Sequence, residues 1–154
     1  MRICVDHLTD SRVLQMLQEH VQSMHLYSPP ESIHVLDADG LRKPEITFWS
    51  IWENEELLGC GALRELDSAQ GEVKSMRTAT AHRRKGVARR MLEHLLIVAR
   101  ERGYQRLYLE TGSEAAFVAA RNLYASFGFE PCGPFGEYVL DPYSAYMTME
   151  LGSR

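Results

Sequence analysis

Residues 76–90 of the chain read MRTATAHRRKGVARR and join a predicted strand to a predicted helix. Residues 72–78 have the pattern of a strand, and apolar residues recur at helical spacing over 84–102. Four basic or partly basic residues, 82–85, fall where this helix is expected to begin, and no acidic residue follows before Glu93. Because a helix N-terminus carries about half a positive charge, cations there are unfavourable unless an anion binds the turn.

The same turn contains small residues that would admit a phosphate group. Gly86 and Ala88 have little or no side chain, so the backbone can approach a pyrophosphate closely. A solvated basic surface is the alternative interpretation. The chain has neither the G-x-x-x-x-G-K-[ST] loop of nucleotide hydrolases nor the G-x-G-x-x-G turn of dinucleotide-binding domains. The turn therefore predicts a phosphate site of another kind.

The flanking segments alternate between strand and helix patterns and predict an α/β (α+β) domain with a mixed sheet. We expect strands at 1–5, 46–52, 57–66, 72–78, 107–109, a short segment after 127, and 145–151. We expect helices at 10–27, 84–102 and 113–126, with Gly103 ending the second and Ser113 capping the third. Gly59 and Gly61 predict a close backbone approach, and Trp49 and Trp52 are expected to be structural.

Composition narrows the class of protein. With 154 residues, 45% hydrophobic and 25% charged, the chain predicts one domain over 1–154. The net charge of −4 counts against a nucleic-acid binder, and so does the lack of a row of aromatic residues on which bases could stack beside the basic segment. No apolar run is long enough for a membrane span. Cys4, Cys60 and Cys132 form neither a disulfide framework nor a metal motif, so we expect a cytoplasmic protein without a metal.

Two motifs resemble those of the Gcn5-related N-acetyltransferase (GNAT) family. Arg83-x-x-Gly86-x-Ala88 resembles the family's [Q/R]-x-x-G-x-[G/A] turn, which binds the pyrophosphate of acetyl-coenzyme A. Residues 119–130, AARNLYASFGFE, resemble its A-x-x-L-Y-x-x-x-G-F motif. In detail the chain is similar to small bacterial members labelled indole-3-acetic-acid acetyltransferase.

The resemblance implies a mixed, mostly antiparallel sheet flanked by helices. A V-shaped splay between the strand ending at Thr78 and the strand at 107–109 would hold the pantetheine arm. The family can dimerise, so a homodimer is an expectation. The residues implied for acetyl-coenzyme A are Met76, Arg77, Thr78, Arg83, Arg84, Lys85, Gly86, Val87, Ala88, Arg89 and Asn122.

The resemblance also implies a reaction, the transfer of an acetyl group to a primary amine of a small molecule or amino acid. Tyr124 stands at the family's position for the general acid, and a core aromatic is the alternative interpretation. For the general base we expect Glu72, with Glu110 as its rival. A non-catalytic acyl-coenzyme A sensor on the same fold is the competing function, and a nucleic-acid binder is a third.

The acceptor site is less constrained by the sequence. Glu31 or His34 could meet a cationic amine, with Glu110 as a further substrate contact. Lys74 or Arg77 could meet a carboxylate if the substrate is an amino acid. Regular strand alternation predicts that Lys74 and Met76 share one face of the sheet.

Overall fold

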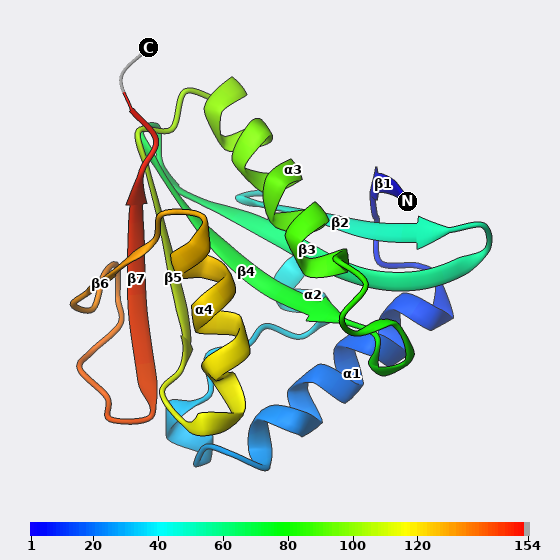
Figure 1. The fold of residues 1–154 in the computed structure, drawn as a ribbon, viewed down its shortest axis with the longest axis horizontal. Coiled ribbons are helices and arrows are strands. Elements are labelled where there is room, and N and C mark those ends of the chain that lie inside the picture. The colour runs from blue at the N-terminus through cyan, green and yellow to red at the C-terminus, as the bar shows by residue number, and fades with distance from the viewer. Residues whose placement is uncertain (153–154) are drawn as a thin grey trace.

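A computed structural model describes residues 1–152 and shows one seven-stranded sheet with helices on both faces (Figure 1). The strand order is β1-β2-β3-β4-β5-β7-β6, and β4–β5 is the only parallel pair among the strands of the described residues. The strands are β1 (Arg2–Val5), β2 (Ile46–Glu53), β3 (Glu56–Asp67), β4 (Gln70–Thr78), β5 (Arg106–Gly112), β6 (Glu130–Cys132) and β7 (Ser144–Glu150). The helices are α1 (Ser11–His25), α2 (Ala38–Leu41), α3 (Val87–Glu101) and α4 (Val118–Ser126). The predicted fold class is confirmed.

Each face of the sheet has its own apolar core. The cluster on the α3 and α4 face includes Trp49, Leu63 and Leu95, whereas the cluster on the α1 and α2 face includes Leu17 and Trp52. Both tryptophans are buried, as expected of structural residues. Within residues 1–152 no helix has the length and hydropathy needed to cross a bilayer.

Two helix starts differ from the sequence prediction. Helix α3 begins at Val87 rather than at 84, because Arg84 (φ 65°) and Gly86 (φ 81°) have left-handed backbone that a helix cannot include. Ser113 does not cap α4, which begins at Val118 after a short 3-10 turn. The Ser113 hydroxyl instead donates to the carbonyl of Pro142, which fixes the connection before β7.

The sheet splays open at its centre. Strands β4 and β5 pair only from Gln70 opposite Arg106 to Val73 opposite Leu109. Beyond that point β4 remains paired with β3, and β5 with β7, so the facing edges of β4 and β5 separate. This divergence matches the V-shaped gap that the resemblance implies.

A β-bulge in β4 changes which side chains face the gap. Ser75 has φ 54°, and the register slips by one residue between the Cys60–Arg77 and Ala62–Lys74 pairs. Lys74 donates a hydrogen bond to Glu72 on one face of the sheet. Met76 packs against the apolar cluster on the other face, the face that α3 and α4 cover. The prediction that Lys74 and Met76 share a face was therefore wrong, because the bulge interrupts strand alternation.

Gly59→Ala is expected to destabilise the fold by about 1–3 kcal/mol, the usual cost of overpacking. A Cβ at Gly59 would lie 2.5 Å from the Arg77 carbonyl oxygen and 3.0 Å from Val87 Cγ1. Urea unfolding checks the loss, with Gly133→Ala as the control because a Cβ there meets nothing within 4 Å. Equal stability of the two variants would contradict the close approach of β3 to β4 and α3.

Candidate active site

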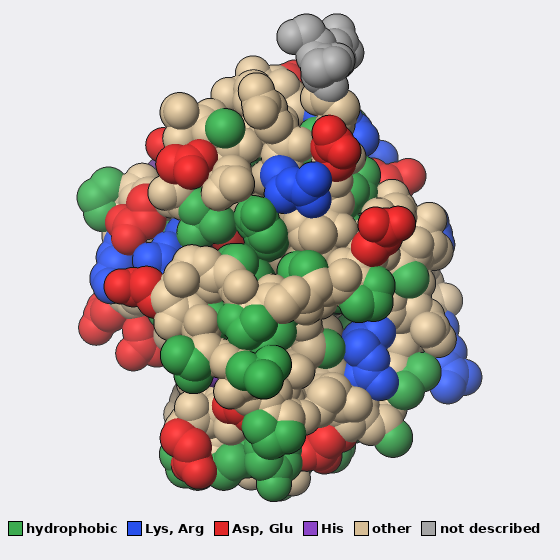
Figure 2. Space-filling model, turned by 90° about the vertical axis from the view of Figure 1, so that its left-hand side faces the viewer, with side chains coloured by type: hydrophobic (Ala, Val, Ile, Leu, Met, Phe, Trp, Pro, Cys, Tyr) green, Lys and Arg blue, Asp and Glu red, His purple; other side chains and the backbone are tan. Residues whose placement is uncertain are grey.

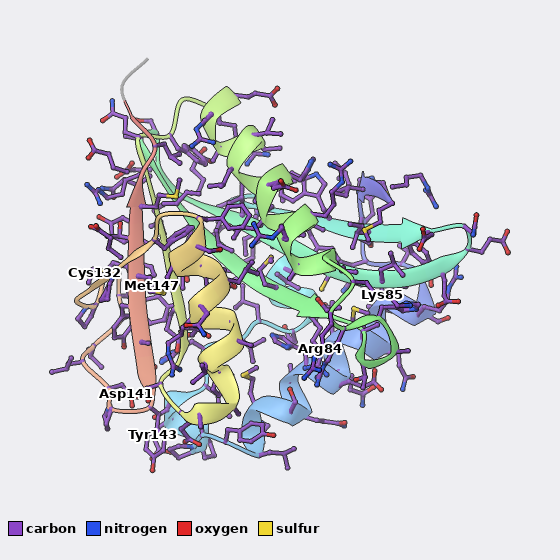
Figure 3. The ribbon with its side chains drawn as sticks, in the orientation of Figure 1. Arg84, Lys85, Cys132, Asp141, Tyr143 and Met147 are labelled. Atoms are coloured by element: carbon purple, nitrogen blue, oxygen red, sulfur yellow. The ribbon has the colours of Figure 1, made fainter. Side chains whose placement is uncertain are left out.

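The turn between β4 and α3 presents an uncapped helix N-terminus beside several cations. Gly86 is the N-cap of α3, and no side chain in residues 1–152 bonds the free N–H groups that follow it. Arg83, Arg84 and Lys85 are exposed, and Figure 3 shows Arg84 and Lys85 on this connecting segment. A Cβ built on Gly86 would meet no atom of residues 1–152 within 4 Å, so there is open space beside Gly86 where α3 begins. The arrangement suits a phosphate group.

His82 and Val87 hold this turn to the rest of the fold. His82 Nε2 contacts the Glu56 carboxylate at the beginning of β3, and the Lys85 ammonium lies 3.1 Å from His82 Nδ1. Val87, the first residue of α3, is 2% exposed and belongs to the apolar cluster on the α3 and α4 face of the sheet. The backbone of the turn is therefore anchored on both sides while its cationic side chains stay in solvent.

A pocket of about 150 Å³ lies at the splay. Its walls come from the diverging parts of β4 and β5, from α1 and α4, and from residues 28–35. Tyr124 enters from the α3 and α4 side of the sheet, whereas Lys74 and His34 enter from the other side. The gap thus brings groups from both faces into one cavity.

Tyr124 is buried in this pocket. Its ring packs edge-on against Phe129 with the centroids 5.8 Å apart. Its hydroxyl makes no side-chain hydrogen bond within the described part of the chain, and burial, followed by the nearby charge of Glu110, raises its pKa. The phenol therefore stays protonated at neutral pH and can donate a hydrogen bond to a group in the pocket.

Glu72 is 1% exposed and belongs to a buried polar cluster. The Tyr138 hydroxyl donates to Glu72 Oε2 at 2.6 Å, and Lys74 Nζ donates to the same oxygen at 3.2 Å and to the Tyr138 oxygen at 3.1 Å. Tyr138 was not predicted, because it lies in the β6–β7 connection, 66 residues from Glu72, where no local pattern indicates the contact.

Glu110 has a different environment from Glu72. Its Oε2 accepts a hydrogen bond from the Ser144 hydroxyl at 2.8 Å. Burial raises its pKa to about 7, although the hydrogen bond and the charge of Lys74 act in the opposite direction, while Glu72 and Asp141 add to the rise. A carboxyl group with this pKa exchanges a proton readily near neutral pH.

Other predicted residues divide between the pocket and the surface. His34 lines the pocket and packs edge-on against Tyr138 at 4.9 Å, whereas Glu31 is exposed and does not line it. Asn122 is exposed on α4 and is also absent from the lining. Arg77 turns to α1, where its Nη1 donates to Ser23 Oγ at 3.0 Å. Over residues 1–152, no group of His, Cys, Asp or Glu side chains is arranged to hold a metal ion.

Comparison with known proteins identifies the family. The model of the acetyltransferase (GNAT) family matches residues 13–129. The chain belongs to the GNAT family. The uncharacterized N-acetyltransferase YsnE of Bacillus subtilis (strain 168) is 57% identical over 98% of this chain and 100% of that protein. The IAA acetyltransferase of Azospirillum brasilense is 37% identical over 90% of each chain. These relatives confirm that this GNAT protein is an acyltransferase.

Solved GNAT structures share the fold. An acetyltransferase from Streptococcus agalactiae superposes with a TM-score of 0.73 at 18% identity, covering 97% of each chain. A GNAT acetyltransferase from Elizabethkingia anophelis with acetyl-CoA bound has a TM-score of 0.67 at 17% identity, also covering 97% of each chain. The second of these neighbours has acetyl-CoA bound.

Proposed function

We propose that the protein transfers the acetyl group of acetyl-CoA directly to a primary amine of a small molecule or amino acid. The observation that carries the proposal is the pocket at the splay, which gathers Tyr124, Glu72 and Glu110 beside an unpaired strand edge. Family membership supports acyl transfer, and the carboxylates support an amine as the acceptor. A non-catalytic sensor would not need an acid and a base in one cavity.

The donor would lie along the edge of β4 that β5 leaves free. Backbone N–H and C=O groups of Met76 to Thr78 would pair with the pantetheine amides like those of an added strand. The pyrophosphate would lie at the N-terminus of α3, within reach of Arg83, Arg84, Lys85 and Arg89. Open space at Gly86 supports this placement.

The chemistry requires a neutral amine and a protonated leaving group. Glu110 would take a proton from the ammonium, after which the nitrogen attacks the thioester carbonyl and the carbon–sulfur bond breaks. Tyr124 would protonate the departing thiolate and regain a proton from the amine as the amide forms. The base role suits Glu110 better than Glu72, because Tyr138 and Lys74 already occupy one oxygen of Glu72.

Glu110→Gln is expected to lower kcat/KM by about 100- to 1,000-fold and to remove its pH dependence around neutrality. In the unsubstituted protein the rate should rise with pH through about 7 as Glu110 ionises. The pH–rate profile checks this, with Glu65→Gln as the control because Glu65 likewise accepts a hydroxyl hydrogen bond, from Tyr104. An unchanged profile in Glu110→Gln would assign the base elsewhere.

The same substitution should change the pH dependence of stability. The pKa of Glu110 rises from 4.5 to about 7 on folding, so its stabilising contribution is complete below pH 4.5 and is lost as the pH rises through 7. The loss amounts to about 3 kcal/mol at most. Glu110→Gln should therefore reduce the decline in unfolding free energy between pH 5 and pH 8, as measured by urea denaturation. An equal decline in both proteins would contradict the raised pKa.

Amine-dependent thiol release tests the proposed function itself. Acetyl-CoA is mixed with the protein and a panel of primary amines, and both free thiol and the mass of the acetylated product are measured. The proposal predicts release that depends on the amine and equals the product formed. Binding of acetyl-CoA without amine-dependent release would favour the sensor.

The homodimer implied by the resemblance remains a prediction. Figure 2 looks onto the β6–β7 side of the molecule and shows hydrophobic side chains gathered over the middle of that face. Val139 is 73% exposed and Leu140 is 84% exposed in the segment between these strands. Such exposed apolar side chains support association of two copies, which sedimentation velocity would measure.

A further inference from the structure

The pocket at the splay contains several buried polar atoms that lack partners. His20 Nδ1, Glu72 Oε1 and Ser75 Oγ are all buried, and none has a hydrogen-bond partner within residues 1–152. All three residues line this one pocket. Because buried polar atoms are nearly always hydrogen-bonded in folded proteins, three such residues in the lining of one pocket point to a ligand that supplies both donors and acceptors.

Lys74 adds an unused donor beside them. Its side chain is 7% exposed, and its ammonium uses two N–H groups, one on Glu72 Oε2 and one on Tyr138. The third N–H is available to an acceptor atom. A free N–H of Lys74 therefore lies next to Glu72 Oε1, the carboxylate oxygen that Lys74 does not bond.

The charge of the pocket restricts the ligand further. Glu72 and Lys74 neutralise each other, and Glu110 is half ionised near its pKa of about 7. Burial lowers the pKa of His20 to about 4 and also lowers that of His34, so both rings are neutral. The lining thus has between zero and one net negative charge, which suits a zwitterion or a monocation and not a polyamine.

We propose that the acceptor is an α-amino acid with an apolar side chain, an inference that rests on the proposed function. Its carboxylate accepts the third N–H of Lys74, and its ammonium donates to Glu72 Oε1 beside the base Glu110. The adjacency of these two protein groups fits a ligand whose ammonium and carboxylate are on the same carbon. Its side chain packs among Met24, Ile33 and Phe117, which line the same pocket.

Matched ligands test this proposal without any substitution. Calorimetry on the protein saturated with coenzyme A compares L-leucine with 3-methylbutylamine, and L-phenylalanine with 2-phenylethylamine. Each pair differs only in the carboxylate. Because a hydrogen bond to a charged group is worth a factor of about 10 to 100, the amino acid should bind that much more tightly. Equal or tighter binding of the amines, or a preference for spermidine or 6-aminohexanoate, would overturn the proposal.

A double variant tests the assignment to Lys74 and Glu72. Lys74→Met alone would leave the buried Glu72 carboxylate without a compensating positive charge. The substitution is therefore combined with Glu72→Gln, which keeps the net charge of this pair at zero. The preference for the amino acid over its amine should disappear in this variant, whereas Lys43→Met with Glu45→Gln should retain it. A folded double variant of Lys74 and Glu72 that keeps the preference would overturn the assignment.

The two proposals can fail separately. Acetylation of simple amines without a carboxylate preference in binding would overturn this inference and leave the proposed function standing. A carboxylate preference in calorimetry without transfer to any amine would overturn the proposed function and support the ligand class.

Discussion

Gly86→Glu is expected to lower the affinity for acetyl-CoA at least about 100-fold. Its new side chain would enter the open space beside Gly86 at the start of α3, close to where the pyrophosphate is proposed to lie. Two like charges about 4 Å apart near a protein surface repel by about 4 kcal/mol, which is more than enough for this loss. Calorimetric titration with acetyl-CoA measures the change directly.

Gly103→Glu is the matched control for this substitution. Gly103 has the same φ of 81° as Gly86, and a Cβ there also meets nothing within 4 Å, but it lies at the opposite end of α3. Both variants therefore place a non-glycine residue at the same positive φ, which makes the backbone strain comparable. Equal affinity for acetyl-CoA in the two variants would contradict a phosphate site at the N-terminus of α3.

Tyr124→Phe is expected to lower kcat about 100-fold while leaving the dissociation constant of acetyl-CoA unchanged. The substitution removes only the hydroxyl, which makes no side-chain hydrogen bond within residues 1–152, so the packing against Phe129 is retained. The burial that raises the pKa of Tyr124 would also raise that of a thiol in the same pocket, so the phenol remains a usable proton donor. Steady-state kinetics and calorimetry separate the two effects.

Tyr104→Phe serves as the control for Tyr124→Phe. Tyr104 is 3% exposed and donates to Glu65 at 2.7 Å, and it does not line the pocket. The Tyr104→Phe variant should unfold more easily and keep the kcat of the unsubstituted protein. If Tyr124→Phe kept the kcat of the unsubstituted protein, the leaving thiolate would have to gain its proton from another group, and the assigned acid would be wrong.

Structural elements that depend on neighbouring residues could be predicted from the sequence. Residues 76–90 have a strand pattern, a basic turn and a helix pattern in immediate succession, and the structure has these elements in the same order. Gly103, predicted to end the long helix, does follow it with φ 81°. Local propensity and hydrophobic spacing determine such features, so the residues of one chain segment are enough to predict them.

Features set by long-range pairing could not be predicted. The bulge at Ser75 depends on the register between β3 and β4, and it reversed the expected direction of Met76. Tyr138 reaches Glu72 from a loop whose course no periodic pattern indicates. Ser113 had a better partner in the distant carbonyl of Pro142 than in the end of α4. In each case tertiary contacts outweigh the local preference.

A thermal-shift titration with acetyl-CoA tests the central claim, that the turn before α3 and the splay form an acetyl-CoA site. It is run beside coenzyme A and ATP. A site saturated to about 100 times its dissociation constant gains about 2.7 kcal/mol of stability. We predict stabilisation of this size by both coenzymes and little by ATP. The absence of any shift in a folded sample, or an equal shift with ATP, would contradict the claim.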